Sequence, residues 1–378
     1  MKIGILTLPL YTNYGGLLQA FALQTVLKRM GHKPLTVAQP RRISLLRRIL
    51  SVVKRLGLLM AGHKGIVVRA YPTAKENKII GWHTDRFIDE NISVTEIIDS
   101  SGQMSLLKKY GFEAYVVGSD QVWRPDYAPC ITNYFLDFLG EKEYVKRIAY
   151  AASFGVDNWK LSPKETSKCA TLARRFNSIS VREDSGVALC KEHLGVGAEQ
   201  VLDPTMLLSK EDYIDLIEKD NIAPQKGVLM TYVLDKAPEK NTIIQRIATE
   251  LELNVISVMP RSEFSEVGKK NLEDCVFPPV TEWLRGFWDA EYIVTDSFHG
   301  IILSIIFNKP FIAIGNKERG LARFTSLLKK FGLEERLILS PDELKPDYIH
   351  TPIDFPKVNV LLKNEQLRAI NFLSEALK

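Results

Sequence analysis

The stretch "IVTDSFHG", residues 293–300, contains the end of one predicted element and the beginning of another. Residues 290–294 form an apolar run with the length of a buried strand, and residues 295–297 are Thr, Asp and Ser, which favour the N-terminus of a helix. A second apolar run, of helical length, occupies residues 301–307. We therefore expect His299 on the first turn of a helix, just beyond the end of a strand. In open α/β sheets, ligands bind at this position.

Strand-like and helix-like segments alternate along most of the chain, which predicts parallel sheets with helices on both faces. Its 378 residues suit two domains of roughly 150 residues each. We predict an α/β fold with two Rossmann-like domains, 1–207 and 208–378, that face a cleft. A last helix at 365–377 is expected to pack back on the first domain. The predicted strands lie within residues 2–8, 113–118, 147–155, 178–183, 227–234, 253–259, 290–294 and 310–315.

Several classes of protein are disfavoured by composition and by missing motifs. A net charge of +5 argues against a polycationic nucleic-acid binder. The sequence contains no run of eighteen apolar residues, so no membrane span is predicted. The four cysteines form no C-x-x-C pair, so neither a zinc site nor a disulfide framework is predicted, and a cytoplasmic enzyme fits best. G-x-G-x-x-G after the first strand, the P-loop, G-x-S-x-G and H-E-x-x-H are all missing. A dehydrogenase is therefore the least favoured enzyme.

Polar residues follow nearly every predicted strand, at ends that meet along one edge of a parallel sheet. One histidine, several carboxylates and several cations are expected there, which suits an anionic substrate and proton transfer. The candidate site residues are Asn13, Gly15, Gly16, Ser119, Asp120, Gln121, Ser153, Arg182, Ser297, His299, Lys317 and Arg319.

Each candidate also has a purely structural interpretation. Asp120 and Asp296 are residue types that cap helices, the glycines at 15–16 suit a tight turn, and the cations at 317–319 suit a solvated loop. His299 alone among the six histidines follows a buried strand, although a capped core histidine would have the same pattern. The pair at 203–204, Asp-Pro, is expected to form a turn without a chemical role.

An ordered set of motifs resembles the polysaccharide pyruvyl transferase family over most of the chain. The set comprises "KIGILTLPLYTNYGGLLQAFALQTVLKRMGH", "VVGSDQVWRP", "YAASFG", "SVRED", "VLDPTMLL", "TDSFHG" and "KERGLARF". Members of this family are similar in fold to GT-B glycosyltransferases. The resemblance implies transfer of pyruvate from phosphoenolpyruvate to a sugar of a bacterial surface polysaccharide or its precursor, forming a cyclic ketal. The acceptor is expected on the first domain and the donor on the second.

The resemblance implies site residues at His299, Arg182, Lys317, Arg319 and Arg323. Many members have R-x-H-G where this chain has Ser297 two places before the histidine. A planar guanidinium suits the carboxylate and phosphate of the donor, and a histidine suits proton transfer near neutral pH. We expect His299 to act as the acid and Asp120 as the base, with no metal or cofactor. A glycosyltransferase with a nucleotide-sugar donor and a non-catalytic sugar-binding relative are the alternatives.

Residues 41–75 form a basic amphipathic segment with nine Lys or Arg and no Asp or Glu. Apolar residues recur there at helical spacing, and Arg41, Arg48 and Arg55 are spaced seven apart on the opposite face. One interpretation is an ordinary surface helix of the first domain. The other is a helix that lies on an anionic membrane surface, which would place the enzyme peripherally on the inner membrane face and suit a lipid-linked saccharide acceptor.

Overall fold

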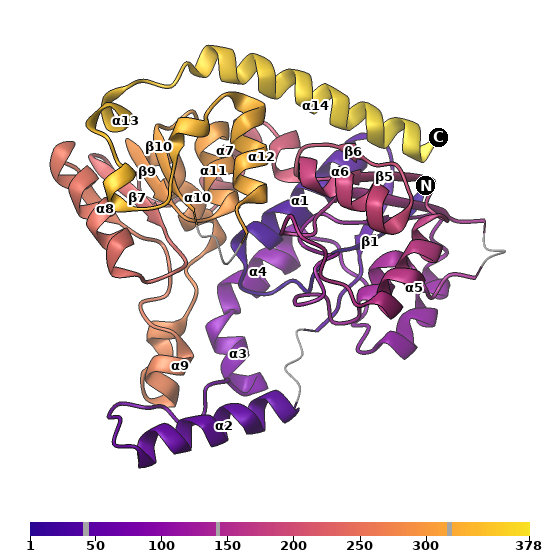
Figure 1. The fold of residues 1–378 in the computed structure, drawn as a ribbon, viewed down its shortest axis with the longest axis horizontal. Coiled ribbons are helices and arrows are strands. Elements are labelled where there is room, and N and C mark those ends of the chain that lie inside the picture. The colour runs from indigo at the N-terminus through magenta and orange to yellow at the C-terminus, as the bar shows by residue number, and fades with distance from the viewer. Residues whose placement is uncertain (41–44, 141–143, 316–319) are drawn as a thin grey trace.

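The computed structural model describes residues 1–40, 45–140, 144–315 and 320–378 and contains two parallel sheets (Figure 1). The first sheet has strand order β2-β1-β3-β4-β5-β6 and the second has order β11-β10-β9-β7-β8, with parallel pairing throughout. The strands of the first sheet are β1 (Lys2–Leu6), β2 (Lys33–Thr36), β3 (Ala114–Val117), β4 (Lys146–Ala152), β5 (Ser178–Val181) and β6 (Glu199–Gln200). Those of the second are β7 (Val228–Tyr232), β8 (Asn254–Ile256), β9 (Tyr292–Thr295), β10 (Phe311–Ile314) and β11 (Leu337–Ile338). The predicted α/β fold is confirmed.

Helices cover both faces of the two sheets, so the central strands are buried at every position, as in β3, β9 and β10. The helices of the first half are α1 (Tyr14–Arg29), α2 (Leu45–Met60), α3 (Ala74–Ile80), α4 (Trp82–Asn91), α5 (Pro163–Ala173) and α6 (Asp184–Leu189). Those that follow are α7 (Lys210–Lys219), α8 (Pro238–Glu250), α9 (Phe264–Val267), α10 (Val280–Asp289), α11 (Phe298–Ile306), α12 (Ala322–Phe331), α13 (Pro346–His350) and α14 (Phe355–Leu377). None of these helices has the length and apolarity to cross a membrane.

Helix α1 joins the two halves at the centre of the molecule. Its N-cap residue, Asn13, accepts a hydrogen bond from the amide of Gly16 at 3.2 Å. The ring of Tyr14 stacks on Trp283 of α10 at 4.9 Å, and its hydroxyl donates to the carbonyl of Pro278 at 2.7 Å. Because both halves cover α1, most of its side chains are buried, whichever way they point.

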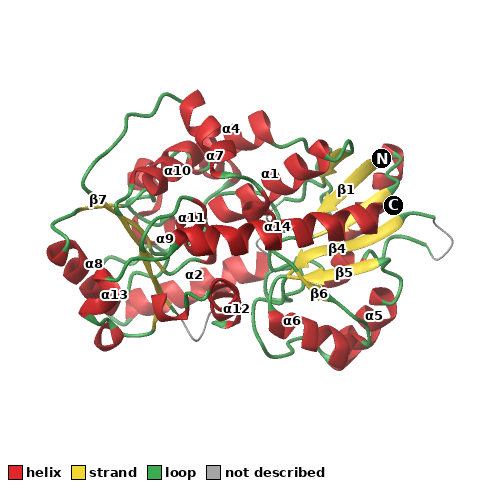
Figure 2. Cartoon of the chain, turned by 90° about the horizontal axis from the view of Figure 1, so that it is seen from above, coloured by secondary structure: helices red, strands yellow, loops and turns green. Residues whose placement is uncertain are grey.

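The C-terminal helix α14 also connects the halves, and it is longer than the predicted 365–377. Asp354 caps its start by accepting from the amide of Lys357 at 3.1 Å. The helix then crosses the molecule to the first sheet (Figure 2). There Gln366 donates to the carbonyl of Met206 at 2.6 Å, and the ring of Phe372 lies 6.3 Å from that of Tyr150 on β4.

An arm formed by α2 and α3 extends below both sheets and lies beside α9 of the second half (Figure 1). Arg55 of α2 donates to the carbonyl of Ser265 on α9 at 2.9 Å. Ile80 at the end of α3 packs with Phe264 and Cys275 in a small separate core. The segment after β2 therefore rests on the second half and not on the sheet from which it departs.

Candidate active site

A cleft of about 800 Å³ lies between the two sheets, at the carboxyl ends of their strands. In each sheet the strand order reverses at one point, between β1 and β3 in the first and between β7 and β9 in the second. Such switch points leave a crevice where ligands bind. The two switch points face the same cleft. Its walls include residues 8–13 and 120–121 from the first half and residues 296–299 from the second.

His299 lies in this cleft on the first turn of α11, as predicted, and its imidazole is buried against α1. A Cβ atom placed on Gly15 would lie 2.1 Å from Nδ1 of His299, so only glycine leaves room for the ring. The Nε2 atom has no hydrogen-bond partner among the described residues and lies 3.9 Å from Oδ2 of Asp203. A buried imidazole nitrogen that lacks a partner in a cleft is available to a ligand.

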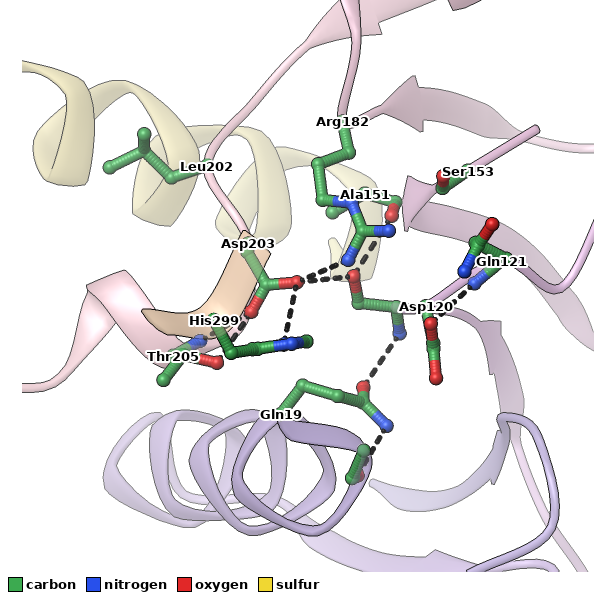
Figure 3. A network of polar contacts seen from close by, with 12 residues as sticks. Gln19, Asp120, Gln121, Ala151, Ser153, Arg182, Leu202, Asp203, Thr205 and His299 are labelled. Carbon is green, nitrogen blue, oxygen red and sulfur yellow. Dashed lines mark hydrogen bonds and ion pairs between the residues drawn. The ribbon is translucent and has the colours of Figure 1, made fainter. Parts of the chain in front are cut away.

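Asp203 is at the centre of the polar network behind His299 (Figure 3). Its Oδ2 accepts from Nη1 of Arg182 at 2.8 Å and from the hydroxyl of Ser119 at 3.0 Å. Its Oδ1 accepts from the amide of Thr205 at 3.0 Å and from its hydroxyl at 2.6 Å. The predicted turn at Asp203 and Pro204 is confirmed. Its carboxylate is the counter-ion of the buried Arg182 and lies 3.9 Å from Nε2 of His299.

The pKa values of the two groups follow from this arrangement. Burial lowers the pKa of His299 below its ordinary value, although the carboxylate of Asp203 opposes the shift. Burial would raise the pKa of Asp203, but His299, Arg182 and the hydrogen bonds from Thr205 together lower it. The lowered pKa of His299 favours its neutral form near neutral pH, and an added negative charge in the cleft would favour its protonation.

The structure places Arg182 differently from the expectation of direct contact with substrate. Its side chain is 2% exposed and is not among the residues that line the cleft. The guanidinium pairs with Asp203 and with Glu183, whose Oε1 lies 3.5 Å from Nε, and it lies 4.4 Å over the ring of Phe298. Burial would lower its pKa, but the charges of Glu183 and Asp203 raise it. This geometry makes Arg182 a support for the cleft wall.

Two more predicted binding residues, Ser119 and Ser153, also lie beneath the cleft surface. Both are fully buried. The amide of Ser119 donates to Oε1 of Gln19 on α1 at 3.1 Å, which connects the β3 loop to that helix (Figure 3). The hydroxyl of Ser153 donates to Glu183 and accepts from the amide of Gly155. These serines hold the strand ends in place.

Arg323, near the start of α12, lines the cleft together with His299. Its guanidinium lies 5.8 Å over the ring of Phe298, on which Arg182 also packs. Burial and the neighbouring charge of Arg182 lower the pKa of Arg323 to about 10, so the group stays charged at neutral pH. Its Nε has no hydrogen-bond partner among the described residues. An anion would satisfy both this charge and this donor.

Asp120 and Gln121 line the opposite wall, directly after β3. Asp120 adopts φ of 70°, in the left-handed region, and its Oδ1 accepts from the amide of Gln121 at 2.8 Å. The side chain of Gln121 accepts in turn from Arg124 at 3.0 Å. Asp120 is a buried carboxylate that the first half contributes to the cleft.

The remaining predicted residues have mixed roles. Asn13, Gly16 and Ser297 line the cleft, and Asn13 also caps α1. Asp296, which lines the cleft as well, is engaged by Lys240 and by the amide of Leu234. Lys317 and Arg319 lie outside the described residues.

Asp203, Thr205 and Gln19 are the site residues that the sequence analysis missed. Asp203 follows the strand end at β6, which is the same placement that singled out His299, so this signal was present in the sequence. It was overlooked because Asp before Pro is also common in turns. Thr205 and Gln19 carry no comparable signal.

The two facing sheets and their shared cleft define a GT-B-like protein. UDP-GlcNAc 2-epimerase from Neisseria meningitidis, solved with UDP-GlcNAc, matches with a TM-score of 0.53 and 10% identity, over 100% of this chain and 99% of that chain. The S. aureus MnaA–UDP co-structure matches with a TM-score of 0.49 and 13% identity, over 99% of this chain and 91% of that chain. At such identities the likeness concerns the fold alone.

The sequence itself identifies the family. The family model for polysaccharide pyruvyl transferase matches residues 13–318, which include Asn13, Asp120 and His299 of the cleft. The chain belongs to the polysaccharide pyruvyl transferase family, and the family implies a transferase with a saccharide acceptor. No curated protein matches the sequence.

Proposed function

We propose that this chain transfers pyruvate from phosphoenolpyruvate to two hydroxyls of a saccharide, with His299 as the acid and Asp120 as the base. The observation that carries the proposal is the pair of unpartnered groups at the inner end of the cleft. Nε2 of His299 and Nε of Arg323 both lack hydrogen-bond partners among the described residues. A proton carrier beside a free guanidinium suits a substrate that is anionic and must be protonated.

The proposed chemistry needs one acid and one base, and no metal or redox cofactor takes part. Arg323 binds the carboxylate or phosphate of the donor. The donor's negative charge raises the pKa of His299, which then protonates the methylene carbon. One acceptor hydroxyl attacks the resulting cationic carbon and gives its proton to Asp120. Phosphate leaves, and the second hydroxyl closes the ketal. Of the two hydroxyl protons, one restores the acid and the other leaves with phosphate.

The direct test is phosphate release from phosphoenolpyruvate by the purified chain in the presence of a hydroxyl-rich saccharide. His299→Ala is expected to lower turnover by roughly 10²–10⁴-fold, as for the loss of a general acid. His63→Ala is the matched control, because His63 is exposed and does not line the cleft. Normal turnover of the His299 variant would refute the assignment of the acid.

The same preparation separates the alternative functions. If phosphoenolpyruvate raises the melting temperature and a nucleotide sugar does not, the donor proposed here is supported. The opposite result would make the chain a glycosyltransferase. Ligand-induced stabilisation without phosphate release, over a panel of acceptors, would favour a non-catalytic sugar-binding relative.

We further propose that the acceptor is built on a lipid carrier and that the enzyme acts in the cytoplasm, at the inner membrane face. The basic segment 41–75 supports this location, because it carries nine cations and no acidic residue.

A further inference from the structure

The apolar side of α2 points away from the protein. Leu46, Leu50, Val53 and Met60 are 66%, 59%, 60% and 90% exposed, and they recur at spacings of three, four and seven along the helix. Ile49 and Leu56 extend the same side. These six residues, named here the α2 stripe, form a continuous apolar face on one side of one helix. A soluble monomer rarely exposes such a face without a partner for it.

The side of α2 that faces the protein is centred on polar residues and is flanked by the half-buried Val52 and Leu58. Nη1 of Arg55 donates to the carbonyls of Val67 at 2.8 Å and Ser265 at 2.9 Å, and Arg48 and Ser51 are half-buried on the same side. An ordinary surface helix has the reverse orientation, with its apolar side on the core. The interpretation as an ordinary surface helix therefore does not account for the six exposed apolar residues of the α2 stripe.

The charges around the α2 stripe indicate what covers it. Lys54 is exposed beside the stripe, within a segment that has nine cations and no acidic residue. A second copy paired through this stripe would bring two such segments together, and their like charges would repel. Anionic lipid headgroups would instead neutralise the cations, while the stripe enters the boundary with the acyl chains.

Helix α2 lies next to the cleft. Arg47, on the first turn of α2, and Tyr71, which follows the helix, line the same cleft as His299. The α2 stripe and the mouth of the cleft therefore belong to one region of the molecule, whereas α14 lies on the opposite side (Figure 1).

We propose that α2 docks the protein on an anionic bilayer and presents the cleft mouth to a saccharide carried by a membrane lipid. The lipid-linked acceptor rests on the proposed function, but the docking itself does not. The helix lies in the interface and does not cross the bilayer.

Vesicle co-sedimentation tests the docking, with phosphatidylglycerol–phosphatidylcholine vesicles and pure phosphatidylcholine vesicles at low and high salt. The wild-type chain is expected to sediment with the anionic vesicles at low salt and less at high salt. Leu50→Asp with Val53→Asp should lower the partition coefficient at least about tenfold, because two charges enter the apolar stripe. Lys54→Gln should lower it by roughly fivefold, the equivalent of one basic contact.

The matched control is Val360→Asp with Leu367→Asp on α14, where the two side chains are 61% and 54% exposed. This variant should bind vesicles like the wild type. A wild-type chain that stays in the supernatant at low salt would overturn the proposal, and so would unchanged binding of the Leu50/Val53 variant. A dimer in light scattering that this variant dissociates, without vesicle binding, would show that a second copy covers the stripe.

The vesicle-binding result does not depend on whether the chain catalyses pyruvyl transfer. The Leu50/Val53 variant should release phosphate normally with a water-soluble acceptor, because neither residue lines the cleft. Vesicle binding by a chain that never releases phosphate would support the docking and refute only the proposed function.

Discussion

Gly15 and His299 are in contact across the two halves of the protein: a Cβ atom on Gly15 would lie 2.1 Å from Nδ1 and 2.3 Å from Cγ of the imidazole. Gly15 is in the first turn of α1 and His299 is in the first turn of α11. The two helix starts, one from each switch point, therefore meet at the residue proposed as the acid. Glycine is required here because a side chain would collide with the imidazole ring. Its backbone has ordinary helical angles and would itself accept another residue.

Gly15→Ala should displace the imidazole and lower pyruvyl transfer by roughly 10²-fold, the effect of misplacing a catalytic group by about 1 Å. Stability should fall far less than activity, because alanine favours the helix. Steady-state rates and thermal unfolding measure the two effects. Gly197→Ala is the control, because a Cβ there meets nothing within 4 Å. Full activity of the Gly15 variant would show that the ring position does not matter.

Asp203→Asn should destabilise the fold by about 3 kcal/mol, because it leaves the buried guanidinium of Arg182 with Glu183 as its remaining acidic neighbour. It should also lower the pKa of His299 further, since Asp203 opposes the effect of burial. Urea unfolding measures the first effect. The alkaline limb of the pH–rate profile measures the second and should move to lower pH. Glu96→Gln, which breaks the surface pair with Lys109, should change neither. An unmoved pH profile would limit Asp203 to a purely structural role.

Acid should destabilise the wild-type chain in part through His299. The pKa of His299 is lowered in the folded state from 6.5, so below about pH 6.5 the unfolded chain binds a proton that the folded chain does not. The free energy of unfolding must therefore fall as the pH falls through this value. His299→Gln lacks this titration, so the stability of the wild type relative to the variant should decline between pH 8 and pH 5 in urea unfolding. A difference that stays constant would contradict the lowered pKa.

Arg323 and Arg182 should respond differently to substitution. Arg323→Gln should weaken phosphoenolpyruvate binding at least about tenfold, because it removes a charge-assisted contact at the cleft surface. Arg182→Lys should clearly lower the melting temperature and change the affinity for phosphoenolpyruvate much less. The reason is that lysine cannot both pair with Asp203 and lie flat on Phe298. Calorimetric titration and thermal unfolding of the two variants provide the comparison, with Arg368→Gln on the exposed side of α14 as the control. A large loss of affinity in the Arg182 variant alone would restore its predicted role as the donor clamp.

The fold class and the position of His299 follow from patterns that are local in the sequence. The alternation of apolar strands with helical segments is a local property, and residues that follow parallel strands must gather at one edge of a sheet. Asp120, Gln121, Ser297 and Asn13 lie in the cleft for this reason. The amphipathic pattern of α2 was also visible, because helical periodicity needs only neighbouring residues.

Tertiary packing sets which strand-end residues face the cleft and which lie beneath it. Arg182, Ser119 and Ser153 follow strands just as His299 does, but the depth of a side chain depends on what packs over it. Asp203 acquired its role because Arg182 had to be neutralised in a buried place, and sequence spacing carries no information about such a pairing. The outward direction of the α2 stripe was likewise decided by hydrogen bonds from Arg55 to backbone carbonyls, one of them on α9 in the other half of the chain.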